Sequence, residues 1–209
     1  MSTKHIKPVN FKVTVYGGTN NKEYTIQEIT ECEKLGTWLG RNQIEILTGA
    51  CKGMPYFTGR AAVLAGGKVT GFTPAKNQKE HVEKYDFPLD GVSDLVFNKT
   101  RYYTMAENFL RRSWDMTPFS DVVIALGGSW GTYSELIFSF FAKKIIILVE
   151  NFGGAVEAFK NTHSFFGARD VNPAVHNGSI IITVPDIAKA IDVVRKYRDK
   201  ADPLHKPQS

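Results

Sequence analysis

Residues 120–135 contain the residue types whose spacing in this chain could support chemistry. An apolar run of strand length, residues 121–126, leads directly into Gly127, Gly128, Ser129, Trp130, Gly131 and Thr132. A strand that ends in glycines and continues as a helix leaves bare backbone N–H groups at the helix N-terminus, where they bind anions such as phosphate. Glu135 follows three residues after Thr132, so a carboxylate stands beside this anion site. A phosphate site next to a carboxylate predicts sugar-phosphate chemistry.

The same residues also permit an interpretation without a ligand. Thr132 and Glu135 have the spacing of a capping box, in which the threonine caps the helix and the glutamate bonds back to the threonine N–H. In that case neither side chain does chemistry. This stretch alone supports both interpretations equally.

The elements around this stretch alternate between strand and helix. Short apolar or alternating runs predict strands at 11–16, 44–48, 68–74, 94–97, 121–126, 144–149 and 179–184. Helical spacing predicts helices at 25–41, around 60–65, at 101–116, after 127, at 153–160 and from 185, with a short helix within 75–89 and an irregular segment at 162–177. This order predicts an α/β fold with a doubly wound parallel sheet in three layers. We expect one domain over residues 1–209, with flexible tails at 1–10 and 199–209.

Two earlier strands of the predicted sheet also end in glycine turns. The strand at 11–16 is followed by Gly17, Gly18, Thr19 and Asn20, and the strand at 44–48 by Gly49 and then Gly53. Parallel sheets of this class bind ligands at the carboxyl ends of their strands. We therefore assign these residues to ligand binding, and a purely structural turn is the alternative for Gly17, Gly18 and Asn20.

The composition argues against several classes of function. The 209 residues are 43% apolar and 22% charged, and a net charge of +5 arises from 26 Lys and Arg against 21 Asp and Glu. The basic residues form no stripe with interleaved aromatic residues, which argues against nucleic-acid binding. No apolar run approaches the roughly 18 residues of a membrane span. We expect a soluble, cytoplasmic protein without nucleic-acid or membrane partners.

The cysteines and histidines form no metal-binding pattern. Cys32 and Cys51 lack the spacing of a metal site or a disulfide framework, which is typical of a reducing compartment. His81, His163 and His176 also lack ligand spacing and are interpreted as surface or loop residues. We expect neither a metal nor another cofactor.

The helix after Glu135 is apolar on nearly all sides. Its apolar residues include Leu136, Ile137, Phe138, Phe140 and Phe141. A helix of this kind is buried on more than one side, which makes it a candidate subunit interface. We expect a homodimer or a higher homo-oligomer.

The three glycine turns together resemble the Lonely Guy (LOG) family, whose members were long labelled lysine decarboxylases. The family pattern is proline or glycine followed by Gly-Gly-x-Gly-Thr-x-x-Glu, which residues 127–135 match with Ser129 at the second motif glycine. The turns at Gly17 and Gly49 agree in order and place. The resemblance covers residues 13–149, and three linked turns are more specific than one.

This resemblance implies a Rossmann-like fold of the wider SLOG superfamily, usually dimeric. It implies hydrolysis of the N-glycosidic bond of nucleoside 5′-monophosphates, which yields free base and ribose 5-phosphate. The superfamily also contains nucleotide-binding sensors and a molybdenum-cofactor carrier, so a non-catalytic carrier or sensor is the alternative. In the hydrolase, Glu135 would stabilise an oxocarbenium-like state and orient water, while the turn at 127–132 would hold the 5′-phosphate.

One further departure from the family concerns an arginine. LOG hydrolases carry it in the helix before the motif, where this chain has Glu107, with Asn108 assigned to nucleotide binding. Arg111 or Arg112, about one turn later, would replace it, and a solvent-facing arginine pair is the alternative. Glu107 is either a second carboxylate of the site or a glutamate on the helix surface. Trp130 either stacks on a base or is buried in the turn.

Overall fold

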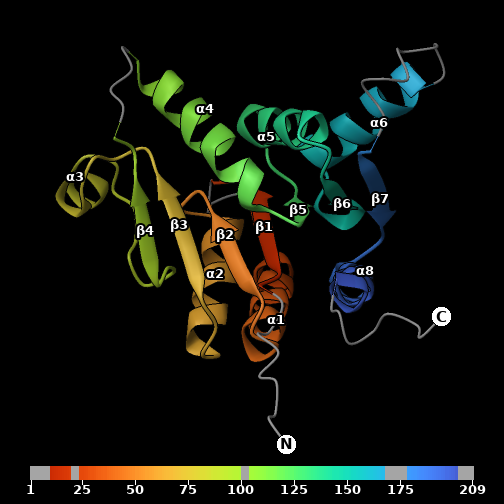
Figure 1. Cartoon of the computed structure of the whole chain (residues 1–209), viewed down its shortest axis with the longest axis horizontal. Coiled ribbons are helices and arrows are strands. Elements are labelled where there is room, and N and C mark those ends of the chain that lie inside the picture. Colours follow the sequence, from red (N-terminus) through yellow and green to blue (C-terminus); the bar gives the residue numbers. More distant parts are fainter. Residues whose placement is uncertain (1–9, 20–23, 100–103, 168–177, 202–209) are drawn as a thin grey trace, which may run out of the picture.

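In the computed structural model, the protein is built around a seven-stranded sheet (Figure 1). The structure describes residues 10–19, 24–99, 104–167 and 178–201. The strands are β1 (Lys12–Gly17), β2 (Glu45–Thr48), β3 (Val69–Thr73), β4 (Asp94–Phe97), β5 (Val122–Leu126), β6 (Ile145–Val149) and β7 (Ile180–Val184). All neighbouring strands pair in parallel, in the order β4-β3-β2-β1-β5-β6-β7. The predicted doubly wound parallel sheet is therefore confirmed.

Helices cover both faces of this sheet, which gives three layers (Figure 1). One face carries α1 (Ile26–Arg41), α2 (Met54–Leu64) and α8 (Ile187–Ala201). The other carries α4 (Met105–Met116), α5 (Trp130–Phe141) and α6 (Ala155–Gly167). The short α3 (Gln78–Glu83) lies at the β4 edge.

The central strands feed two hydrophobic cores because successive side chains point to opposite faces. In β5, Val122, Ile124 and Leu126 belong to the core under α1, α2 and α8. Val123 and Ala125 belong to the core under α5 and α6. This two-sided burial explains why the strand is a continuous apolar run.

The observed elements differ from the predicted ones mainly at two places. Helix α6 continues to Gly167, so the prediction of an irregular segment from 162 is wrong for residues 162–167, and residues 168–177 lie outside the described part. The helix is held there by contacts with α5, including the bond between the Tyr133 and Thr162 hydroxyls at 2.8 Å. Helix α8 runs to Ala201, so the predicted tail from 199 begins with helix.

The strand order places a crevice at one point of the sheet. The chain moves outward from β1 through β2, β3 and β4, and then returns to the other side of β1 with β5. Ligands of open α/β sheets bind beyond the carboxyl ends of the strands at such a switch point.

In the described ranges, no helix combines the length and the apolar character that a membrane crossing requires.

Candidate functional site

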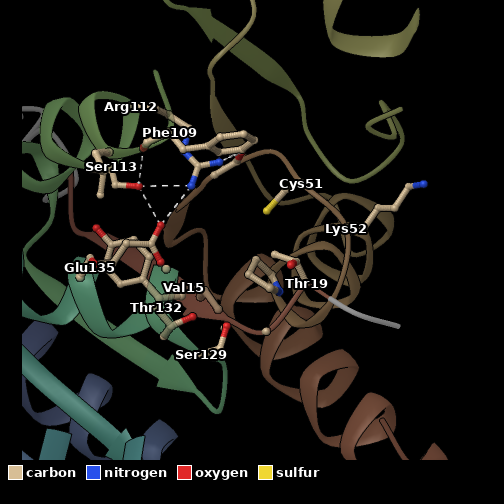
Figure 2. A pocket seen from close by; sticks show the side chains of 18 of the residues that line it. Val15, Thr19, Cys51, Lys52, Phe109, Arg112, Ser113, Ser129, Thr132 and Glu135 are labelled. Carbon is tan, nitrogen blue, oxygen red and sulfur yellow. Dashed lines mark hydrogen bonds and ion pairs between the residues drawn. The ribbon is translucent and has the colours of Figure 1, made fainter. Parts of the chain in front are cut away.

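A cavity of about 390 Å³ lies at this switch point, a volume within the range of small-molecule sites. Its walls come from the end of β1, the loop between β2 and α2, and the segment that precedes β4. Helix α4 and the first turns of α5 complete them. Figure 2 shows Arg112, Ser113 and Glu135 converging on one side, Ser129 and Thr132 on a second, and Cys51 and Lys52 on a third.

The N-terminus of α5 is open to this cavity. Ser129 is the N-cap residue, and its side chain makes no capping hydrogen bond. By contrast, α1 and α4 both begin with complete capping boxes, formed by Thr25 with Glu28 and by Thr104 with Glu107. Because Ser129, Gly131 and Thr132 line the cavity, the first N–H groups of α5 remain for an anion.

The backbone before α5 needs glycine. Gly127 and Gly128 have φ values of +60° and +92°, a region that side chains other than glycine rarely adopt. Ser129, at the position of the second motif glycine, has φ −132° and is therefore not strained by its side chain. The serine departure from the LOG pattern thus leaves the turn intact.

Gly128→Ala is expected to destabilise the protein by about 1–3 kcal/mol and to weaken binding of inorganic phosphate. An added Cβ would lie 2.1 Å from Thr132 Oγ1, at a left-handed φ. Gly131→Ala is the matched control for stability, because a Cβ there meets nothing within 4 Å. Urea unfolding and phosphate titration measure both effects. Equal stability and binding of Gly128→Ala and wild type would show that the turn does not need this geometry.

Glu135 does not form the capping box that its spacing with Thr132 permits. Helix α5 begins at Trp130, so Glu135 lies in its second turn, 7% exposed and directed at α4. Its Oε1 accepts hydrogen bonds from Ser113 Oγ at 2.8 Å and from Arg112 NH2 at 3.1 Å. The capping interpretation is therefore wrong, and the carboxylate belongs to the cavity.

Arg112 is the arginine that reaches the cavity. Its NH1 donates to the Gly49 carbonyl at 2.9 Å, and its NH2 forms the ion pair with Glu135. Its Nε is buried and has no hydrogen-bond partner among the described residues. Arg111 instead pairs with Asp115 on the outer surface of α4, so of the two candidates only Arg112 belongs to the site.

The electrostatic balance at Glu135 is set by burial and by one cation. Loss of solvent raises the pKa of the Glu135 carboxyl, and the Arg112 guanidinium opposes this rise together with the bonds from Ser113 and Arg112. Burial also raises the pKa of Cys51, whose thiol lines the cavity. Cys51 is therefore a neutral thiol rather than a thiolate nucleophile.

The two earlier glycine turns also reach the cavity. Gly17, Gly18, Thr19 and Gly49 line it, whereas Asn20 lies outside the described residues. Gly53 is the N-cap of α2 with φ +90°, and the Gly18 carbonyl accepts the Met54 N–H at 3.0 Å. Gly53 therefore shapes the wall through Gly18.

The interpretation of Trp130 as a buried turn residue and the surface placement of His81 are wrong. Trp130 is 84% exposed and outside the cavity lining, so it is neither buried in the turn nor part of the pocket wall. Asn108 bonds to Asn98 and to the Thr104 carbonyl instead of lining the cavity. Glu107 is exposed and caps α4, which agrees with the predicted alternative of a glutamate on the helix surface. His81 is fully buried rather than a surface residue.

Several cavity residues carry no sequence signal of their own. Lys52 and Ser113 are ordinary polar residues of a loop and a helix, and Phe87 comes from the segment between β3 and β4. Phe109 and Phe138 belong to the apolar spacing of α4 and α5, which predicts burial rather than a site. Only the register of α4 could have indicated Ser113, next to Arg112.

No metal centre is found in the part of the chain that the structure describes. No three His, Cys, Asp or Glu side chains gather there closely enough to hold an ion. The expectation that the protein works without a metal or cofactor stays a prediction.

The model of the SLOG cluster4 family matches residues 10–177. No curated protein matches the chain significantly. The solved structure of TM1055 is similar with a TM-score of 0.72 and 20% identity, over 89% of this chain and 99% of that one.

Two other similar structures have described ligands. The molybdenum cofactor carrier protein of Chlamydomonas reinhardtii has a TM-score of 0.62 and 21% identity, over 89% of this chain and 97% of that one. The DNA processing protein A of Helicobacter pylori, described by its single-stranded DNA binding mode, has a TM-score of 0.60 and 15% identity, over 90% of this chain and 81% of that one. At these identities the likeness shows the shared fold.

Proposed function

This chain belongs to the SLOG cluster4 family, and we propose that it hydrolyses the N-glycosidic bond of nucleoside 5′-monophosphates. The products are free base and ribose 5-phosphate. The observation that carries this proposal is the buried Glu135 carboxylate, which shares one cavity with the uncapped N-terminus of α5. A carboxylate beside a phosphate-binding helix terminus suits a reaction at the sugar of a sugar phosphate.

The 5′-phosphate binds at the first turn of α5. The backbone there supplies N–H donors and the positive end of the helix dipole beside Ser129, Gly131 and Thr132. Arg112 adds a positive charge to the same cavity, and its Nε is the buried side-chain donor that the described protein groups leave unpaired. An unpaired buried donor is typical of a site in which a ligand or an ordered water completes the bonding.

The chemistry takes place at the anomeric carbon. The bond from this carbon to the base nitrogen breaks and positive charge builds on the sugar. Water then adds to the carbon as a hydroxyl group, and its other proton passes to Glu135 and from there to the departing base nitrogen. The ionised Glu135 stabilises that charge. Both hydrogen bonds from α4 end on Oε1, so Oε2 takes part in neither and is the oxygen we assign to water.

The test is a panel of nucleoside 5′-monophosphates incubated with the purified protein and separated by chromatography. We expect at least one to release free base together with ribose 5-phosphate in equal amounts. Release of phosphate without base would indicate a phosphatase instead. Tight binding of nucleotides with no product from any of them would contradict the hydrolase.

The second candidate is a non-catalytic carrier or sensor. The ion pair between Glu135 and Arg112 favours it, because a carboxylate already neutralised by a buried cation can serve to shape a binding pocket. The similar protein of Chlamydomonas is a molybdenum cofactor carrier, which suggests a cofactor as cargo. The panel separates the two candidates, since a carrier leaves its ligand intact.

We propose further that the protein is a cytoplasmic homodimer without nucleic-acid partners. Phe141 is 57% exposed, and Leu110 and Trp114 of the neighbouring α4 are also exposed, which leaves apolar surface over these helices for a second copy. The similarity to DNA processing protein A keeps DNA binding open to test, while the net charge of +5 without a basic stripe argues against it.

A further inference from the structure

We propose that Phe87 and Phe109 form a stacking wall for the planar heteroaromatic ring of the ligand, in which Phe87 stacks on the ring and Phe109 contacts its edge. This proposal rests on the proposed function, because it assigns the base to one end of the same cavity. It makes Phe87, from the segment between α3 and β4, a residue that determines specificity.

Two parts of the cavity lining carry this proposal. Ser129 and Thr132 line the cavity at the N-terminus of α5, and Phe87 and Phe109 line it beside α4, where Arg112 and Ser113 add polar groups. Figure 2 shows Phe109 and Ser129 on opposite sides of the cavity, with Glu135 between them along one wall. A ligand that places its phosphate at Ser129 therefore extends its other end toward Phe109, and the sugar between them passes Glu135.

The rings of this wall are fixed by aromatic neighbours. Tyr85 stacks on Phe87 with ring centroids 5.6 Å apart, and Phe87 meets Phe109 at 6.3 Å with a steep angle between the rings. The Arg112 guanidinium lies over the Phe109 ring at 5.2 Å. A rigid aromatic surface loses little freedom when a planar ring stacks on it, which favours bases over flexible apolar groups.

The segment that carries Phe87 is anchored at both ends. His81 contacts the Thr73 hydroxyl through Nδ1 at 2.8 Å and the Pro88 carbonyl through Nε2 at 3.4 Å. Lys52, which lines the cavity, forms an ion pair with Asp86 across its rim. These contacts hold the segment against the cavity, so the ring of Phe87 is a built part of the wall.

The experiment compares two probes that differ in the ring. Formycin 5′-monophosphate has a purine-like ring joined to ribose by a carbon–carbon bond, so an N-glycosidase cannot cleave it, and ribose 5-phosphate lacks the ring. We expect Phe87→Leu to weaken binding of formycin 5′-monophosphate about tenfold, as for loss of one stacking contact. Binding of ribose 5-phosphate should change less than about twofold, because its contacts lie at α5.

Two further variants complete the test by calorimetric titration. Phe87→Tyr keeps the ring face and is expected to bind both probes like wild type. Phe119→Leu is the matched control, since this exposed phenylalanine lies outside the lining of the cavity and should change neither affinity. A thermal melt of each variant confirms that it folds.

Three results would overturn the stacking wall. In Phe87→Leu, the affinity for both probes could fall equally, or the affinity for neither could fall. The wild type could also bind formycin 5′-monophosphate no tighter than ribose 5-phosphate. Failure of the hydrolase is seen separately, in the nucleotide panel. A Phe87-dependent preference for the ring without any hydrolysis would keep the wall and contradict the enzyme.

Discussion

Glu135→Gln is expected to lower the rate of nucleotide hydrolysis by about 10²- to 10⁴-fold, the contribution of a positioned general base. Glutamine keeps the size of the side chain and an oxygen that accepts the bonds from Ser113 and Arg112. It removes the negative charge that stabilises the positive charge developing on the sugar. Rates of base release under saturating substrate measure the effect, and the affinity for formycin 5′-monophosphate should stay within about threefold, because phosphate and ring bind elsewhere.

Glu157→Gln is the matched control for this experiment. Glu157 also belongs to a helix of the same face of the sheet, but it is exposed in the first turn of α6 and does not line the cavity. Its substitution should leave the rate unchanged. Full activity of Glu135→Gln would exclude the carboxylate from the chemistry, whatever the cavity binds.

Arg112→Met is expected to destabilise the protein by about 3–5 kcal/mol at neutral pH, the usual cost of removing one partner of a buried ion pair. The change leaves Glu135 buried without its cation, and it also removes the bond to the Gly49 carbonyl that ties α4 to the β2–α2 loop. Methionine fills much of the same space as the arginine stem. Urea unfolding followed by circular dichroism measures the loss.

The destabilisation in Arg112→Met should depend on pH in one direction. Burial raises the pKa of Glu135, and without Arg112 the main opposing charge is gone. The folded state then binds a proton more tightly than the unfolded chain, so stability is highest at low pH and falls as the pH rises through the raised pKa. The difference from wild type should therefore shrink below the ordinary pKa range of glutamate and grow toward neutral pH.

Two variants test the cause of this effect. Arg111→Met is the neighbouring control, and because the ion pair of Arg111 with Asp115 is exposed to solvent, its substitution should cost less than about 1 kcal/mol. The double variant Arg112→Met with Glu135→Gln should recover part of the loss, since no buried charge remains. An equal loss of stability in Arg111→Met and Arg112→Met would contradict a special role for Arg112.

Much of the fold could be predicted because the sheet is buried on both faces. Strands such as β5 and β6 are continuous apolar runs, and their predicted ends agree with the structure within one residue. Helix α6 shows where this local signal stops. Its second half carries Asn161, Thr162 and His163, which favour helix weakly, and it is held by packing against α5 instead.

The site was predictable where one short stretch contains both the backbone signal and the side chain. The glycines before α5 and Glu135 lie within nine residues, and each has a local physical reason to be noticed. Arg111 and Arg112 show the opposite case. Neighbouring positions on a helix point about 100° apart, so the packing of α4 against α5 decides which arginine reaches Glu135.

The sequence by itself determined the alternation of strands and helices, the glycine turns at the carboxyl ends of three strands, and a carboxylate near one of them. These features depend on neighbouring residues, whose spacing sets backbone freedom and burial. Only the tertiary structure decided that Glu135 faces α4 instead of capping its own helix, and that Phe87 joins the same cavity. Both outcomes depend on contacts between segments far apart in the chain, and such contacts exist only once the sheet has brought those segments together.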